Sequence, residues 1–181
     1  MKLNLGCGSE KLEGYINVDC NKELGPDLLC DFTKDGLPYA NGSVEQVVLF
    51  HTIEHIQKSF HLQLLLEIRR VLCPDGTFLI SYPEFTRCYE NWRTNHRGKR
   101  EFWEATIFGR QSSPSDYHVC IMDTPEFSYT LRSAGFRILH CIPEVSEPYN
   151  TVIKVTPDIL QTYSEEVRSN VWTEKPLELK S

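Results

Sequence analysis

The feature that most constrains this 181-residue sequence is a glycine turn directly after its first apolar run. Leu3 and Leu5 form that run, and Gly6, Cys7 and Gly8 end it. Two glycines separated by one residue let the backbone adopt dihedral angles that other residues avoid, and let it approach a ligand closely. A plain turn can have the same sequence, so the motif by itself is weak evidence for a ligand. It does predict a buried strand that ends at the turn.

Six further apolar runs predict six more strands. The first four of them are followed by Asp19, Asp31, His51 and Pro83, so polar or turn-forming residues come directly after these strands. In open α/β sheets, ligands bind outside the carboxyl ends of the strands, where the strand order reverses. The six runs cover residues 15–18, 28–30, 44–50, 77–82, 136–142 and 151–155.

Two segments have the pattern of helices. Residues 57–72 carry an apolar residue at every fourth position, from Phe60 to Leu72, which predicts an amphipathic helix ended by the Pro-Asp-Gly turn at 74–76. Residues 124–134 begin with an N-capping threonine and a proline, and Gly135 follows them, which predicts a second helix. Strands that alternate with helices predict an α/β fold, a Rossmann-like doubly wound sheet with helices on both faces.

Two other segments lie outside this periodic pattern. Residues 84–120 form a long insertion after the fifth strand, and an insertion of this length is typical of a lid or a substrate-binding element. Residues 157–181 form a polar C-terminal tail. We therefore expect one domain over residues 1–156.

Composition narrows the class of protein. The net charge of -6 and the pI near 5.5 disfavour a nucleic-acid partner, because binding to many phosphates requires a basic surface. The seven cysteines are odd in number and form no C-x-x-C pair, which disfavours a disulfide framework and a zinc ribbon. The sequence has no signal segment and no apolar run long enough to span a membrane, so we expect a cytoplasmic protein.

The residues that follow the second and third strands suit an adenosine. Asp19 can accept hydrogen bonds from both hydroxyls of a ribose, as an acidic residue does in dinucleotide-binding folds. Asp31 can accept from an adenine amino group, and the ring of Phe32 can lie on the purine. A surface turn or a helix cap is the alternative role for each aspartate taken alone.

Taken in order, these motifs resemble those of the class I S-adenosylmethionine-dependent methyltransferases, and within them the small type-11-like group. The resemblance covers residues 2–142. It rests on five motifs: the glycine motif at 3–8, the ribose motif at 16–19, the adenine motif at 31–32, the fourth-strand region at 37–55 and the helix-turn-strand at 70–79.

The resemblance implies a sheet of about seven strands with the last strand antiparallel, S-adenosylmethionine as cofactor, and methyl transfer to a nucleophile on the substrate. It assigns Asp19 to the ribose, Asp31 and Phe32 to the adenine, and His51 to the region of the sulfonium. The remaining cofactor-binding residues that it implies, near the methionine part, are Asn4, Gly6, Cys7 and Gly8.

Two departures from the family pattern concern the first strand. Asn4 stands where family members commonly have an acidic residue, which removes a charge near the cofactor. Only nine residues, Gly6 to Gly14, connect the first two strands, fewer than the dozen or so that a parallel crossover normally needs. We therefore expect no full helix in this connection.

Methyl transfer to a hydroxyl needs a positioned general base, and histidine suits that role near neutral pH. His51 is the first candidate, followed by His55, Glu84 and His118. The Asn-Pro-Pro-Tyr or Asp-Pro-Pro-Tyr run typical of nucleobase amino methylation is absent, which disfavours a nucleic-acid amino group as acceptor. We expect the acceptor to be a hydroxyl on a small molecule or glycan. Arginine, lysine and aromatic residues between 87 and 100 can hold an anionic or sugar-bearing acceptor, or can belong to an ordinary amphipathic helix.

Two other functions remain open. His51, Glu54 and His55 match the H-x-x-E-H signature of inverted zinc peptidases, which requires both histidines on one helical face. Because His51 directly follows a predicted strand, the pair is expected to straddle a strand end, and we assign no metal ligand. The third function is a non-catalytic adenosyl-binding domain with the same fold.

Overall fold

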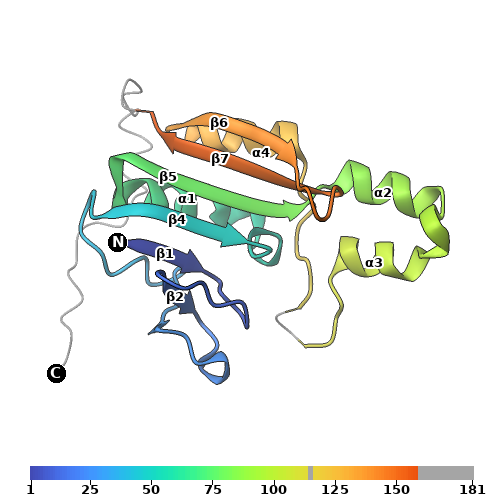
Figure 1. The fold of residues 1–181 in the computed structure, drawn as a ribbon, viewed down its shortest axis with the longest axis horizontal. Coiled ribbons are helices and arrows are strands. Elements are labelled where there is room, and N and C mark those ends of the chain that lie inside the picture. The colour runs from blue at the N-terminus through green and yellow to red at the C-terminus, as the bar shows by residue number, and fades with distance from the viewer. Residues whose placement is uncertain (114–115, 159–181) are drawn as a thin grey trace.

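The structure is a computed structural model that describes residues 1–113 and 116–158 (Figure 1). These residues contain a seven-stranded sheet with the strand order β3-β2-β1-β4-β5-β7-β6. All neighbouring strands are parallel except that β7 runs antiparallel to both β5 and β6. The predicted mixed sheet with an antiparallel last strand is therefore confirmed. The strands are β1 (Lys2–Leu5), β2 (Ile16–Asp19), β3 (Leu28–Leu29), β4 (Val44–Phe50), β5 (Leu72–Pro83), β6 (Phe136–Pro143) and β7 (Asn150–Pro157).

All seven predicted strands are present, and the largest difference in their bounds is at β5. The strand begins at Leu72 rather than at Thr77, because Leu72 already pairs with Val44 of β4. The register then shifts, and pairing resumes between Gln46 and Thr77. The predicted Pro-Asp-Gly turn is thus an irregularity within the strand rather than a separate loop.

Both predicted helices are present, with shorter bounds. The first is α1 (His61–Val71), which is preceded by a short 3₁₀ turn, and the second is α4 (Thr124–Ser133). The N-cap of α4 is Asp123, whose carboxylate accepts from the backbone N–H of Glu126, and not Thr124 as predicted. The remaining helices are α2 (Phe85–Arg93), α3 (Arg100–Phe108) and the 3₁₀ turns η1 (Lys22–Leu24), η2 (Ile53–His55), η3 (Lys58–Phe60) and η4 (His96–Gly98).

The helices are arranged on one side of the sheet and at one end of it. In Figure 1, α1 and α4 lie side by side behind the sheet, whereas α2 and α3 extend beyond the carboxyl end of β5. The prediction of helices on both faces is therefore wrong for the described residues, because the connections among the first four strands contain no α-helix. The predicted C-terminal tail reaches the described residues only at 157–158, and residues 159–181 lie outside them. None of the described helices is both long and apolar enough to cross a membrane.

The core lies between the sheet and the pair α1 and α4. Alternate residues along the central strands point to this side and are completely buried, as the period of two in a strand requires. They include Leu3, Leu5, Val47, Leu49, Phe78 and Ile80, and they form one cluster with Leu65 and Ile68 of α1.

A pair of buried asparagines replaces the missing first helix. Asn4 of β1 donates to the Asn17 carboxamide oxygen at 3.0 Å and to the backbone oxygen of Glu10 at 3.0 Å. Asn17 of β2 also accepts from the backbone N–H of Leu12 at 2.8 Å and donates to Asp27 at 2.8 Å. Side-chain hydrogen bonds thus hold the nine-residue connection against the sheet, and the expected absence of a full helix there is confirmed.

We predict that Asn17→Ala lowers the free energy of unfolding by about 2–3 kcal/mol, because it leaves several buried polar groups without partners. Urea unfolding followed by circular dichroism measures this loss. Asn91→Ala, on the half-exposed surface of α2, is the matched control and is expected to change stability by no more than about 0.5 kcal/mol. Equal shifts for the two variants would contradict a supporting role of Asn17.

Candidate cofactor and active site

The glycine loop and Asp19 meet at the carboxyl ends of β1 and β2. The backbone N–H of Gly8 donates to Oδ2 of Asp19 at 2.9 Å, and the backbone N–H of Asn21 donates to its Oδ1 at 2.8 Å. The backbone N–H of Cys7 donates to the carbonyl of Val18 at 3.1 Å. A carboxylate has about four acceptor sites, so Asp19 keeps lone pairs for a ligand after these two bonds.

The glycine loop also contacts the end of β4. Gly6 has a φ of 65°, and a Cβ atom on it would lie 2.4 Å from Cγ2 of Thr52. Gly8 has a φ of 53° but no atom within 4 Å of such a Cβ. Gly6 is therefore required both for its backbone conformation and for its close approach to Thr52. This contact places the loop beside His51.

Asp31 lies close to Asp19 in space. Its carboxylate accepts from the Thr33 hydroxyl at 2.6 Å and pairs with Lys34 at 2.7 Å. The backbone N–H of Cys30 donates to the carbonyl of Asp19 at 3.0 Å, so the end of β3 brings Asp31 to the same edge of the sheet as Asp19. The glycine turn and Asp19 are therefore in contact, and the convergence of both with Asp31 around one ligand stays a prediction.

Three of the predicted cofactor-binding side chains have other partners. Asn4 is 4% exposed and donates to Glu10 and Asn17, so it supports the loop from beneath. Phe32 is 6% exposed and belongs to the hydrophobic core, so its ring is packed within the protein. The Cys7 side chain is also buried, which leaves only its backbone to line the loop.

His51 stands where β4, β5 and β7 meet. Its φ of 49° is a left-handed conformation, which is strained for a residue with a side chain and is common at functional sites. The ring Nε2 lies 3.2 Å from the Ser81 hydroxyl and 3.4 Å from Nδ2 of Asn150, and Nδ1 lies 3.6 Å from Glu54. The side chain is 44% exposed, so a substrate can reach it.

Acidic residues surround His51. Burial alone would lower the pKa of the imidazole, but the carboxylates of Glu54, Glu144 and Glu147 together outweigh this effect and raise it. Sequence reasoning missed Glu144, Glu147 and Asn150, which lie about a hundred positions from His51 in a hairpin connection that has no motif of its own. Asn150 holds both glutamates through its amide, at 2.9 Å each.

The other predicted bases have structural partners. Glu84 is 6% exposed and caps α2 by accepting from the backbone N–H of Arg87 at 3.0 Å. His118 contacts His55 edge-on, with 4.8 Å between the ring centroids, and burial lowers the pKa of its imidazole. The positions of both residues are thus explained without catalysis.

The H-x-x-E-H pattern does not form a helical zinc site. Because β4 ends at Phe50 and η2 is only three residues long, His51 and His55 do not share a helical face. The two histidines belong to different groups of potential ligands: His51 lies with Glu144 and Glu147, and His55 with Glu54 and His118.

A cavity of about 560 Å³ lies between α2, α3 and the β6–β7 connection. This volume is in the range of small-molecule sites. Its lining combines aromatic rings with charged groups of both signs. Trp103 and Tyr149 meet edge-on at 5.3 Å, and the lining also includes Phe102, Arg87, Arg97, Lys99, Glu90 and Glu147.

Residues 17–80 match the family model of a methyltransferase domain of type 11. The match covers about a third of the chain. It runs from β2 into β5 and includes Asp19, Asp31 and His51, whereas the glycine loop precedes it. No curated protein matches the sequence.

Solved methyltransferase structures share the fold at low sequence identity. A SAM-dependent methyltransferase from Methanosarcina mazei is 14% identical, with a TM-score of 0.59 over 86% of this chain and 91% of its own. The Burkholderia thailandensis 1,6-didemethyltoxoflavin-N1-methyltransferase, with bound S-adenosylhomocysteine, is 17% identical, with a TM-score of 0.56 over 86% and 70%. A methyltransferase in complex with the Haloferax volcanii Trm112 activator is 16% identical, with a TM-score of 0.58 over 90% and 83%. The chain thus shares the overall fold of these solved methyltransferases.

The two glycines provide a matched test of how tightly the glycine loop packs against Thr52 at the end of β4. We predict that Gly6→Ala destabilises the protein by about 1–3 kcal/mol more than Gly8→Ala. Both variants carry the cost of a positive φ, but only the first also forces a methyl group against Thr52. Urea unfolding of both variants measures the difference, and equal losses of stability would show that the loop moves freely away from β4.

Proposed function

We propose that this chain is an S-adenosylmethionine-dependent methyltransferase that methylates a hydroxyl on a small molecule or glycan. The observation that carries the proposal is the contact between Gly8 and Asp19 at the carboxyl ends of β1 and β2. Of these strands, β1 lies beside β4, where the strand order reverses, and this is the usual ligand position in a doubly wound sheet.

In this proposal Asp19 accepts the ribose hydroxyls with the lone pairs that Gly8 and Asn21 leave free. Asp31 accepts from the adenine amino group. Leu29 pairs with Asp19 across β2 and β3 and is 53% exposed, so we assign the apolar contact with the purine to Leu29 in place of the buried Phe32. The glycine loop lies along the methionine part of the cofactor.

The acceptor is assigned to the cavity beside α3. Phe102 and Tyr149 offer ring faces and edges to a sugar or an aromatic group, while Arg87 and Lys99 suit an anionic substituent. The cavity is lined by Glu147, one of the glutamates next to His51. A substrate in the cavity can therefore extend toward His51.

His51 is the proposed general base. Transfer from a sulfonium is an in-line displacement, and a hydroxyl nucleophile must lose its proton as the bond to the methyl carbon forms. The exposed imidazole is held by Ser81 and Asn150, and its acidic neighbours stabilise the imidazolium that proton transfer creates.

We predict that the protein binds S-adenosylhomocysteine and that Asp19→Ala weakens this binding by about 10- to 150-fold. This range corresponds to the loss of hydrogen bonds to a charged group, about 1.5–3 kcal/mol. Isothermal titration calorimetry measures the dissociation constants. Asp75→Ala is the control, because Asp75 is an exposed carboxylate at the opposite end of the sheet. An absence of binding by the unmodified protein, or unchanged binding by Asp19→Ala, would refute the cofactor site.

The catalytic role is tested first with a panel of hydroxyl- and amine-bearing small molecules and glycans, using a radiolabelled methyl donor. We expect label in a hydroxyl acceptor. His51→Ala should then lower kcat by about 10²- to 10⁴-fold, the usual contribution of a general base, with little change in the affinity for S-adenosylhomocysteine.

His140→Ala, on the exposed surface of β6, is the control for this variant. Full activity of His51→Ala would remove His51 as the base. Cofactor binding without label in any acceptor would favour the non-catalytic adenosyl-binding domain.

A further inference from the structure

The carboxylate of Glu54 is buried without a hydrogen-bond partner. Glu54 is 2% exposed, and neither of its carboxylate oxygens has a hydrogen-bond partner among the described residues. Its Oε1 forms an ion pair with Nδ1 of His51 at 3.6 Å, which is longer than a hydrogen bond. A buried carboxylate is costly unless hydrogen bonds or a bound cation compensate it, and the His51 ion pair supplies no hydrogen bond, so Glu54 keeps both oxygens for a metal ion.

Two histidines lie beside Glu54. One ligand atom from each of Glu54, His55 and His118 can be chosen so that all three lie within 4.8 Å of one another. His55 and His118 come from segments more than sixty positions apart, and their rings meet edge-on at 4.8 Å between centroids. The group is therefore assembled by the tertiary fold.

The orientation of the His55 ring suits metal binding. Nδ1 of His55 lies 2.9 Å from the backbone oxygen of Tyr117. A histidine that binds a metal usually donates its other N–H to a carbonyl or carboxylate, which fixes the tautomer and the ring. In His55 this arrangement leaves Nε2 with its lone pair free.

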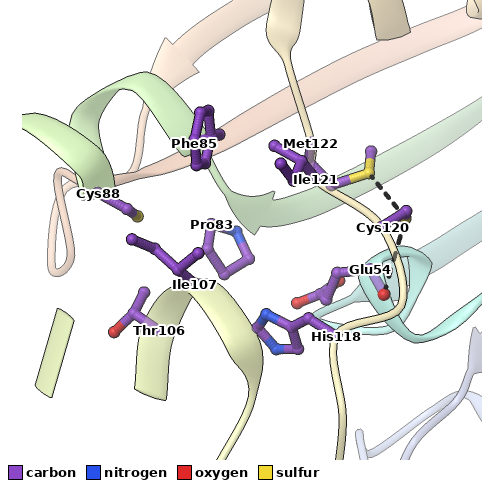
Figure 2. A pocket seen from close by; sticks show the side chains of 10 residues that line it. All are labelled: Glu54, Pro83, Phe85, Cys88, Thr106, Ile107, His118, Cys120, Ile121 and Met122. Carbon is purple, nitrogen blue, oxygen red and sulfur yellow. Dashed lines mark hydrogen bonds between the residues drawn. The ribbon is translucent and has the colours of Figure 1, made fainter. Parts of the chain in front are cut away.

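A small cavity lies beside two of the three residues, Glu54 and His118. Figure 2 shows Glu54 and His118 on the wall of a small cavity. Its volume of about 10 Å³ is close to that of one water molecule and far below that of an organic substrate.

We propose that Glu54, His55 and His118 bind one divalent transition-metal ion, for which Zn²⁺ is the probe. Two imidazoles and one carboxylate are a ligand set that zinc takes in proteins, with bonds of about 2.0–2.2 Å. Tetrahedral bonds of this length hold the ligand atoms about 3.4 Å apart, so the three groups need to approach one another by at most about 1.4 Å. A water molecule can take the fourth position.

The bound ion would connect two parts of the fold. Glu54 and His55 belong to η2 at the end of β4, whereas His118 lies in the segment between α3 and α4. Backbone bonds already run along this junction, from Val119 N–H to the carbonyl of Glu54 and from His118 N–H to that of Phe108. The metal would fix the α2–α3 segment to the sheet, independently of whether the chain is a methyltransferase.

The second group of potential ligands, His51, Glu144 and Glu147, is a weaker candidate. Both of its carboxylates already accept hydrogen bonds from the Asn150 amide. His51 and Glu144 are also partly exposed to water. The experiment therefore has to distinguish zinc binding at this group from zinc binding at Glu54, His55 and His118.

The test is a calorimetric titration of the metal-free full chain with Zn²⁺, followed by Co²⁺ absorption spectroscopy. We expect one bound ion per chain and an affinity at least about tenfold lower in each of His55→Ala, His118→Ala and Glu54→Gln. Glu144→Gln is the matched control and should bind as the unmodified chain does. The Co²⁺ spectrum should show d–d bands without the charge-transfer band that cysteine ligation produces.

Thermal unfolding separates metal binding from damage to the fold. Zn²⁺ should raise the Tm of the unmodified chain but not the Tm of Glu54→Gln. Without metal, Glu54→Gln should be at least as stable as the unmodified chain, because the substitution removes a buried charge. No zinc binding, equal binding by His118→Ala, loss of binding in Glu144→Gln, or a thiolate band with Co²⁺ would each overturn the proposal.

Discussion

The constraint on which the rest of this structure depends is the nine-residue connection between β1 and β2. It is too short for a crossover helix, so side-chain hydrogen bonds must hold the chain against the sheet. The Asn4–Asn17 pair does so beneath the loop, and the Asp19 carboxylate does so at its tip by accepting from Gly8. The same bonds that close the loop also fix the carboxylate that we assign to the cofactor, so stability and binding are coupled at Asp19.

This short connection has consequences for the whole sheet. With no α-helix among the first four strands, the described helices α1 and α4 pack on one face only, and the fully buried apolar residues point to that face. The alternating positions on the other face carry polar groups such as Asn4, Asn17 and Ser81, which are buried by loops and neighbouring strands. The strands β1 and β2 therefore alternate between apolar and polar residues in sequence, unlike parallel strands covered by helices on both sides.

Most of the fold could be predicted because strand periodicity and turn residues are local signals. The seven strands and two helices, and the glycine turn beside Asp19, all follow from short stretches of sequence. The side-chain roles were harder, since they depend on partners far away in the chain. Phe32 packs in the hydrophobic core, and the Asn4 amide donates a hydrogen bond to Asn17. His51 meets Asn150, and Glu54 meets His118, across more than sixty positions.

The helices α2 and α3, which follow β5, form a fixed wall of the cavity that we propose for the acceptor. The backbone N–H of Phe85 donates to the carbonyl of Met122, so the described start and end of the segment between β5 and α4 are joined to each other. On the far side, the rings of Phe102 and Trp103 contact Tyr149 of the β6–β7 connection edge-on, at 5.8 and 5.3 Å. A segment held by packed rings and backbone bonds opens less readily than a free loop. Acceptor selection should therefore depend on the chemistry of these rings and their neighbouring charges, which are in place before any substrate binds.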